Sequence, residues 1–232
     1  MTDVASLTGR LLAVPLVALA RARHGKPMHP RGAIFTGRLE RTGCRPALGV
    51  PWLDEPGSDE AVVRLSRGAG LPEDLPDLLG LAVRVPGPDG RPVDLLLSST
   101  GAGLLTRWVP QPRWDVAGGY CSLMGYRTPA GGTVVLGAVT SRGGRVPSDP
   151  SAATADAAEG SLVLTLSAAP PLGPWRPFAR LVLGAPTDPL DPAVRFDAIV
   201  NPPPGLVADG PVARLREPSY AGARQASTGN PV

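Results

Sequence analysis

Residues 28–40 read MHPRGAIFTGRLE, in which a histidine and a proline lead into a β-type run over residues 33–39. Short runs of the same type recur along the chain, at residues 61–66, 81–85, 93–97, 133–139, 161–166, 178–183 and 194–200. Short strands separated by turn residues are typical of antiparallel barrels and sandwiches, and eight of them suffice to close a barrel. We therefore predict a mainly β or α+β fold: an antiparallel eight-stranded β-barrel with flanking helices.

Turn residues separate these runs. The sequence GPDG at residues 87–90 predicts a hairpin between the third and fourth runs, and AGG at residues 130–132 predicts a second turn. The glycine and proline residues, 29 of each, interrupt apolar runs in this way, so we interpret them as turns and not as disorder.

Three segments outside the runs favour helix. They are an N-terminal stretch at 4–22, an alanine-rich stretch at 149–159 that also fits a flexible insertion, and an Arg-rich closing stretch at 211–225. We expect a single domain over 1–232, divided into an N-terminal helix (1–25), the barrel (26–200), a Pro-rich linker (202–205) and a C-terminal helical segment (206–227).

Charge and cysteine content exclude several classes of partner. Lys26 is the only lysine, the arginines are scattered among almost as many acids, and the net charge is +3, so no nucleic-acid patch is expected. Cys44 and Cys121 are too few for a zinc site or a disulfide framework.

The apolar run at 11–20 is too short to span a bilayer. It lies where a signal peptide would lie, but the cytoplasm is the default expectation.

Four segments, in order and spacing, resemble conserved segments of the haem catalases. Residues 28–40 are similar to VHAKGAGAFGYFE, 63–66 (VRLS) to VRFS, 77–85 (DLLGLAVRV) to DPRGFAVKF, and 94–100 (DLLLSST) to DLVGNNT. A fifth, 216–220 (REPSY), has the R-x-x-x-Y spacing of the proximal ligand segment. The short chain resembles the small catalase-related proteins, and the resemblance implies a catalase-like barrel that binds haem b.

The resemblance also implies residue roles on the distal side of the haem. His29 matches the histidine that moves a proton between the peroxide oxygens, work that suits a group titrating near neutrality. Ser66 matches the serine that orients this histidine, whereas Arg64 and Lys26 match cations that pair with haem propionates. The alternative for His29 is a structural or surface histidine.

On the proximal side, Tyr220 matches the tyrosine that binds the iron. A phenolate needs cations to stabilise it, and Arg216 and Arg224 lie four residues before and after Tyr220, on one helical face. The alternative is a tyrosine that packs on a C-terminal helix among ordinary surface arginines.

The departures from the family pattern bear on the reaction. Ser98 and Ser99 replace both asparagines of DLVGNNT, and Leu79 replaces the arginine of DPRG. A hydroxyl is a shorter and less directed donor than an amide, so efficient dismutation of hydrogen peroxide is not expected.

Two functions remain open. The first is a haem-dependent peroxidase, or hydroperoxide-converting oxidoreductase, that acts on hydrogen peroxide or organic hydroperoxides. The second is a haem-free scaffold that binds a small apolar ligand or a protein partner, and assembly as a homo-oligomer is compatible with either. A hydrolase is disfavoured because the sequence lacks GxSxG, a phosphate loop and a His-rich metal cluster.

Overall fold

Buried and exposed side chains alternate along the strands, and the buried side chains fill the apolar interior that the sheet encloses. In β1 (Arg31–Arg41) the buried residues include Ala33 and Phe35. They lie in register with the buried Leu65 and Val63 of β2 (Gly57–Arg67). Because successive side chains of a strand point to opposite faces, this pattern gives each strand one face inside the barrel and one outside.

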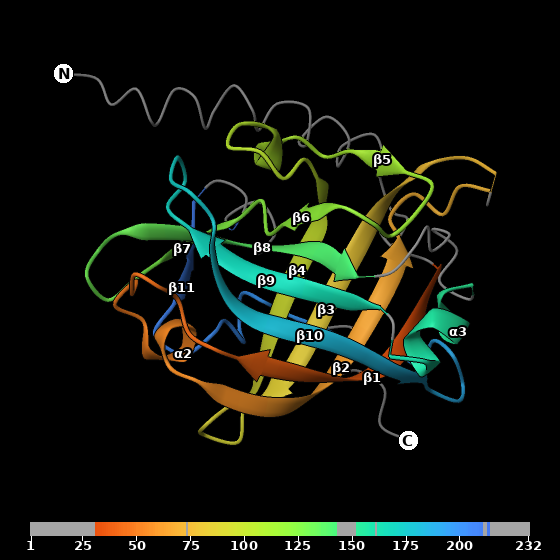
Figure 1. Ribbon diagram of the computed structural model, residues 1–232, viewed down its shortest axis with the longest axis horizontal. Coiled ribbons are helices and arrows are strands. Elements are labelled where there is room, and N and C mark those ends of the chain that lie inside the picture. Colours follow the sequence, from red (N-terminus) through yellow and green to blue (C-terminus); the bar gives the residue numbers. More distant parts are fainter. Residues whose placement is uncertain (1–30, 73, 143–151, 161, 211–212, 214–232) are drawn as a thin grey trace, which may run out of the picture.

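The computed structural model describes residues 31–72, 74–142, 152–160, 162–210 and 213. Eight of its strands close into an antiparallel barrel, in which β8 pairs with β9 and β10 returns to β1 (Figure 1). In spatial order these strands are β1, β2, β3 (Asp77–Pro86), β4 (Pro92–Thr100), β6 (Gly119–Cys121), β8 (Thr133–Arg142), β9 (Val163–Ala169) and β10 (Arg176–Pro186).

Several short strands and helices lie outside the eight barrel strands. The strand β5 (Pro112–Arg113) pairs with β3, while β7 (Gly125–Arg127) pairs with β8 and carries β11 (Val207–Asp209) on its other edge. A one-turn helix, α2 (Pro51–Asp54), and a longer one, α3 (Ala153–Ala158), lie at opposite ends of the barrel (Figure 1). The 3-10 turn η1 (Thr106–Trp108) lies between β4 and β5. No helix in the described ranges has the length and apolarity needed to cross a membrane.

The predicted barrel is confirmed, and seven of the eight predicted runs fall on its strands. The hairpin at 87–90 joins β3 to β4, with the Gly87 amide donating to the Arg91 carbonyl at 2.8 Å. The turn at 130–132 joins β7 to β8. The alanine-rich stretch contains the helix α3.

The predicted strand at 194–200 is wrong. These residues form coil and turn, because the Asp197 carboxylate accepts the amides of Ile199 and Val200 at 3.1 and 3.2 Å and closes a local turn. The eighth barrel strand is β6 instead, which sequence inspection missed because three residues are too few to show a period of two.

The C-terminal prediction needs a second correction. Residues 207–209 are strand and not helix, since they complete the edge beside β7. The expected linker at 202–205 packs onto the protein, with Pro203 buried and its carbonyl accepting the Leu206 amide at 2.9 Å. The expected helices at 4–22 and 211–225 lie outside the described residues, apart from Ala213 in the second segment, and the single-domain organisation stays a prediction.

Candidate functional site

A row of small side chains crosses the outer face of four neighbouring strands. Gly32 of β1 lies opposite Ser66 of β2, Ser66 lies opposite Gly80 of β3, and Gly80 lies opposite Ser98 of β4. We call these four residues the outer row. Adjacent strands are about 4.8 Å apart, so the backbones of Ser66 and Ser98 are separated by roughly 10 Å. Gly80 between them carries no side chain, which leaves the sheet flat there.

Ser66 is held on this face by its own strand pair. Its side chain is almost fully buried, and its hydroxyl donates to the Gly80 carbonyl at 3.4 Å, which is long for a hydroxyl hydrogen bond.

The two adjacent serines of β4 point to opposite faces. Ser98 belongs to the outer row, whereas Ser99 faces inward with Leu97 and is fully buried. The Ser99 hydroxyl accepts the Leu79 amide at 2.9 Å and donates to the Gln111 carbonyl at 2.7 Å. The structure thus brings Ser66 and Ser98 together on one face and leaves Ser99 on the other.

Arg64 closes one end of the outer row. Its guanidinium lies over Gly32, where an added Cβ would come within 2.6 Å of it. It also forms a bidentate ion pair with Asp191, at 2.7 and 2.8 Å. Both side chains are mostly buried, so solvent screens this pair less than an exposed one. Sequence inspection missed Asp191, since no motif surrounds it.

An aromatic cluster lies at the other end of the outer row, beyond Ser98. Cys121 of β6 follows Ser98 in register and packs with Val135 and Ala169, with Trp108 and Trp175 against them. The Trp175 ring fills the space over Gly137, where a Cβ would approach it to 2.6 Å. Burial raises the pKa of the Cys121 thiol, so this side chain is neutral at physiological pH.

A buried polar network is centred on Asp94 of β4 and Arg84 of β3. Asp94 is fully buried and binds Arg84 through two hydrogen bonds of 2.7 Å, which raise the pKa of the Arg84 guanidinium. It also accepts the Asp197 amide at 2.8 Å and the Asn201 side-chain amide at 2.9 Å. The network ties residues 194–201 to the barrel wall, which is a structural role.

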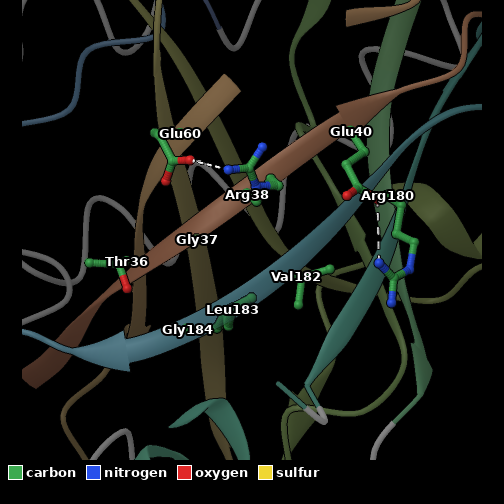
Figure 2. Close-up of a pocket in the computed structure, with 9 residues that line it drawn as sticks. All are labelled: Thr36, Gly37, Arg38, Glu40, Glu60, Arg180, Val182, Leu183 and Gly184. Atoms are coloured by element: carbon green, nitrogen blue, oxygen red, sulfur yellow. Dashed lines mark hydrogen bonds and ion pairs between the residues drawn. The ribbon is translucent and has the colours of Figure 1, made fainter. Parts of the chain in front are cut away.

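A shallow depression of about 440 Å³ opens elsewhere on the outer surface, between β1 and β10 (Figure 2). Its polar lining is already paired, Arg38 with Glu60 at 2.6 Å and Arg180 with Glu40 at 3.4 Å. Exposed ion pairs of this kind carry little energy. The charged side chains of the depression thus pair with one another across neighbouring strands.

The fold resembles two solved fungal structures. The chain matches a fungal catalase with a TM-score of 0.62 at 14% identity, covering 91% of this chain and 61% of that one. It matches catalase A from Saccharomyces cerevisiae with a TM-score of 0.59 at 12% identity, covering 91% of this chain and 63% of that one. The chain has a catalase-like fold. No protein-family model and no curated protein matches the sequence.

The catalase-like barrel holds four of the nine predicted site residues in its described part: Arg64, Ser66, Ser98 and Ser99. The other five, Lys26, His29, Arg216, Tyr220 and Arg224, lie outside the described residues. Within the described ranges no group of three or more His, Cys, Asp or Glu side chains could hold a metal ion.

Proposed function

We propose that this catalase-like protein binds haem b and acts on hydrogen peroxide or organic hydroperoxides as a peroxidase or hydroperoxide-converting enzyme. The observation that carries the proposal is the outer row, with Ser66 and Ser98 on either side of Gly80. These serines belong to segments that resemble the distal-side segments of the haem catalases.

The shape of the outer row supports a flat ligand. None of its four side chains is larger than a hydroxymethyl group, so a planar macrocycle would meet the Arg64 guanidinium over Gly32 but no bulky side chain of the row itself. Sites for cofactors are mostly apolar, with a few directed polar groups, and Ser66 and Ser98 would be two such groups.

The residues that would hold the group come from the whole chain. Tyr220 would bind the iron as a phenolate, with Arg216 and Arg224 stabilising its charge, and Lys26 and Arg64 would face the propionates. The bound haem would supply the redox chemistry on the peroxide. Because Arg64 already binds Asp191 bidentately, a propionate there would have to share its guanidinium.

Proton transfer would be the work of the chain's own side chains. His29 would take a proton from one peroxide oxygen at a ring nitrogen and return it to the leaving oxygen, while Ser66 holds the ring in orientation. Ser98 would offer one hydroxyl donor where catalases carry an amide. Weaker polarisation of the bound peroxide favours peroxidase chemistry over rapid dismutation.

The test is an absorption spectrum of the full chain expressed with a haem supply. We expect a Soret band in the wild type that is lost or shifted in Tyr220→Phe. Tyr120→Phe is the matched control, since the Tyr120 hydroxyl is buried in the barrel and donates to the Val116 carbonyl at 2.9 Å. A Soret band unchanged by Tyr220→Phe would disprove the ligand assignment, and a colourless protein that binds no added hemin would disprove the function.

A haem-free scaffold is the second candidate, and the ion pair of Arg64 with Asp191 favours it. The cation expected to meet a propionate already has a carboxylate partner in the protein. This candidate predicts a colourless protein whose stability does not respond to hemin. Thermal unfolding with and without hemin therefore decides between the two candidates.

A further inference from the structure

Arg107, in the turn η1, is buried without an acid beside it. Its side chain is 2% exposed, and none of the ion pairs between described residues includes it. Its Nη1 atom has no hydrogen-bond partner there, and its Nε reaches the Gly103 carbonyl only at 3.5 Å. A buried guanidinium without an anion is unfavourable, because water no longer solvates its charge.

Other enclosed arginines of the barrel have acceptors around them. Arg67 lies 3.7 Å from the Asp77 carboxylate and donates to the Pro72 and Leu75 carbonyls at 2.9 and 2.6 Å. Arg113, a few residues beyond Arg107, donates to the carbonyls of Thr100 and Ala117. Arg107 is the exception in the same region of the fold.

Trp175 lies directly against the Arg107 guanidinium. The guanidinium carbon lies 4.1 Å from the centre of the indole ring, and the ring is held by a 2.9 Å hydrogen bond from its Nε1 to the Ala102 carbonyl. A cation–π contact of this kind occupies one side of the guanidinium, whose N–H groups can still donate to oxygens. Burial lowers the pKa of Arg107, but an arginine remains charged at every physiological pH.

We propose that Arg107 binds the carboxylate of an organic ligand. A planar carboxylate matches the guanidinium fork, and the apolar surroundings suit an organic acid better than a hydrated inorganic ion. Trp108 packs in the cluster beside it, and Leu104 and Leu105, which directly precede η1, are exposed, at 46% and 65%. The ligand would reach the guanidinium through local opening of the chain beside these exposed residues.

The site adjoins the outer row but does not depend on haem. Cys121, in the cluster beside Arg107, is the register partner of Ser98. The carboxylate could therefore belong to a free organic acid or to a propionate of a haem on the outer row. Both sources present the same chemistry to Arg107.

Thermal unfolding of the full chain in sodium propionate, against sodium chloride of equal ionic strength, tests the site. A saturating ligand should raise the Tm of the wild type by about 2–4 °C, and Arg107→Leu should abolish the shift. Arg113→Leu is the matched control and should keep the shift, although its own Tm is lower. Should Arg107→Leu not fold, Arg107→Lys keeps the charge but not the fork, and its shift should be smaller.

Equal propionate shifts in the wild type and Arg107→Leu, or no shift in the wild type, would overturn the proposal. Hemin and hemin dimethyl ester then identify the source. If the wild type binds hemin more tightly than the ester and Arg107→Leu removes the difference, the carboxylate is a propionate. If Arg107→Leu loses the propionate shift and hemin binding is unaffected or absent, the ligand is a free organic acid, whatever becomes of the haem proposal.

Discussion

The two serines of β4 illustrate how position decides the role of a residue. Ser98 belongs to the outer row. Ser99 is buried, and its hydroxyl accepts one hydrogen bond from a backbone amide and donates another to a backbone carbonyl. Loss of a buried hydroxyl leaves the Leu79 amide and the Gln111 carbonyl without this partner. Substitution of Ser99 should therefore lower the stability of the protein, whereas substitution of Ser98 should affect its function.

We expect Ser99→Ala to lower the free energy of unfolding by about 1–3 kcal/mol, because two buried backbone groups lose a hydrogen bond. Ser98→Ala should change it by less than about 0.5 kcal/mol, as substitutions away from such networks do. Urea unfolding followed by circular dichroism measures both. Equal losses in the two variants would contradict the assignment of the two side chains to opposite faces.

At the scale of the element, one buried carboxylate makes several of the contacts that hold residues 194–201. Asp94 receives hydrogen bonds from Arg84, Asp197 and Asn201, and all of its side chain is buried. Its removal leaves the Arg84 guanidinium without its acidic partner and weakens the attachment of the segment. We expect Asp94→Ala to destabilise the protein by about 3–5 kcal/mol.

Chemical denaturation of Asp94→Ala measures this loss, and Asp89→Ala in the exposed β3–β4 turn is the control. Limited proteolysis should also cut between residues 194 and 201 faster in the variant. A loss of less than about 1 kcal/mol would mean that the segment is held by its other contacts.

The contact of Trp175 with β8 gives an element-scale prediction with an optical readout. A Cβ at Gly137 would lie 2.6 Å from the indole and 2.9 Å from the Tyr120 carbonyl. Gly137→Ala should therefore displace Trp175 and shift tryptophan fluorescence to longer wavelength, with a stability loss of about 1–3 kcal/mol. Gly132→Ala, which meets only an ordinary contact at 3.5 Å, should change neither. Unchanged fluorescence in Gly137→Ala would contradict the packing of Trp175 on this strand.

At the scale of the whole molecule, a buried thiol contributes to the pH dependence of the unfolding free energy. Burial, helped by the Asp54 carboxylate, raises the pKa of Cys44 from 9.0 to about 11. A folded-state pKa above the unfolded one means that the native state holds its proton longer. The contribution of Cys44 is thus complete below pH 9 and is lost as the pH rises from 9 to 11.

Cys44→Ala should remove this part of the alkaline loss. The difference in unfolding free energy between the wild type and Cys44→Ala should be constant up to pH 8.5 and should shrink above pH 9. Denaturant unfolding at pH 7, 8.5 and 10.5 measures it. A difference that stays constant through pH 10.5 would show that the native thiol ionises as easily as the unfolded one.

Most of the barrel could be predicted from local sequence patterns. Seven strands and the β3–β4 hairpin follow from local patterns, because alternation and turn chemistry are properties of neighbouring residues. Resemblance to short catalase segments also selected Ser66 and Ser98, which the fold places on one face.

The remaining features depend on contacts between residues that are distant in the chain. The strand β6 is too short to carry a pattern, and it forms because β4 and β8 leave a gap that it bridges. Asp191 meets Arg64 across 127 residues of sequence, and Asn201 meets Asp94 across 107. The inward turn of Ser99 and the burial of Arg107 likewise follow from register and closure. Such contacts join residues that are distant in the chain, so no local pattern specifies them; barrel closure does.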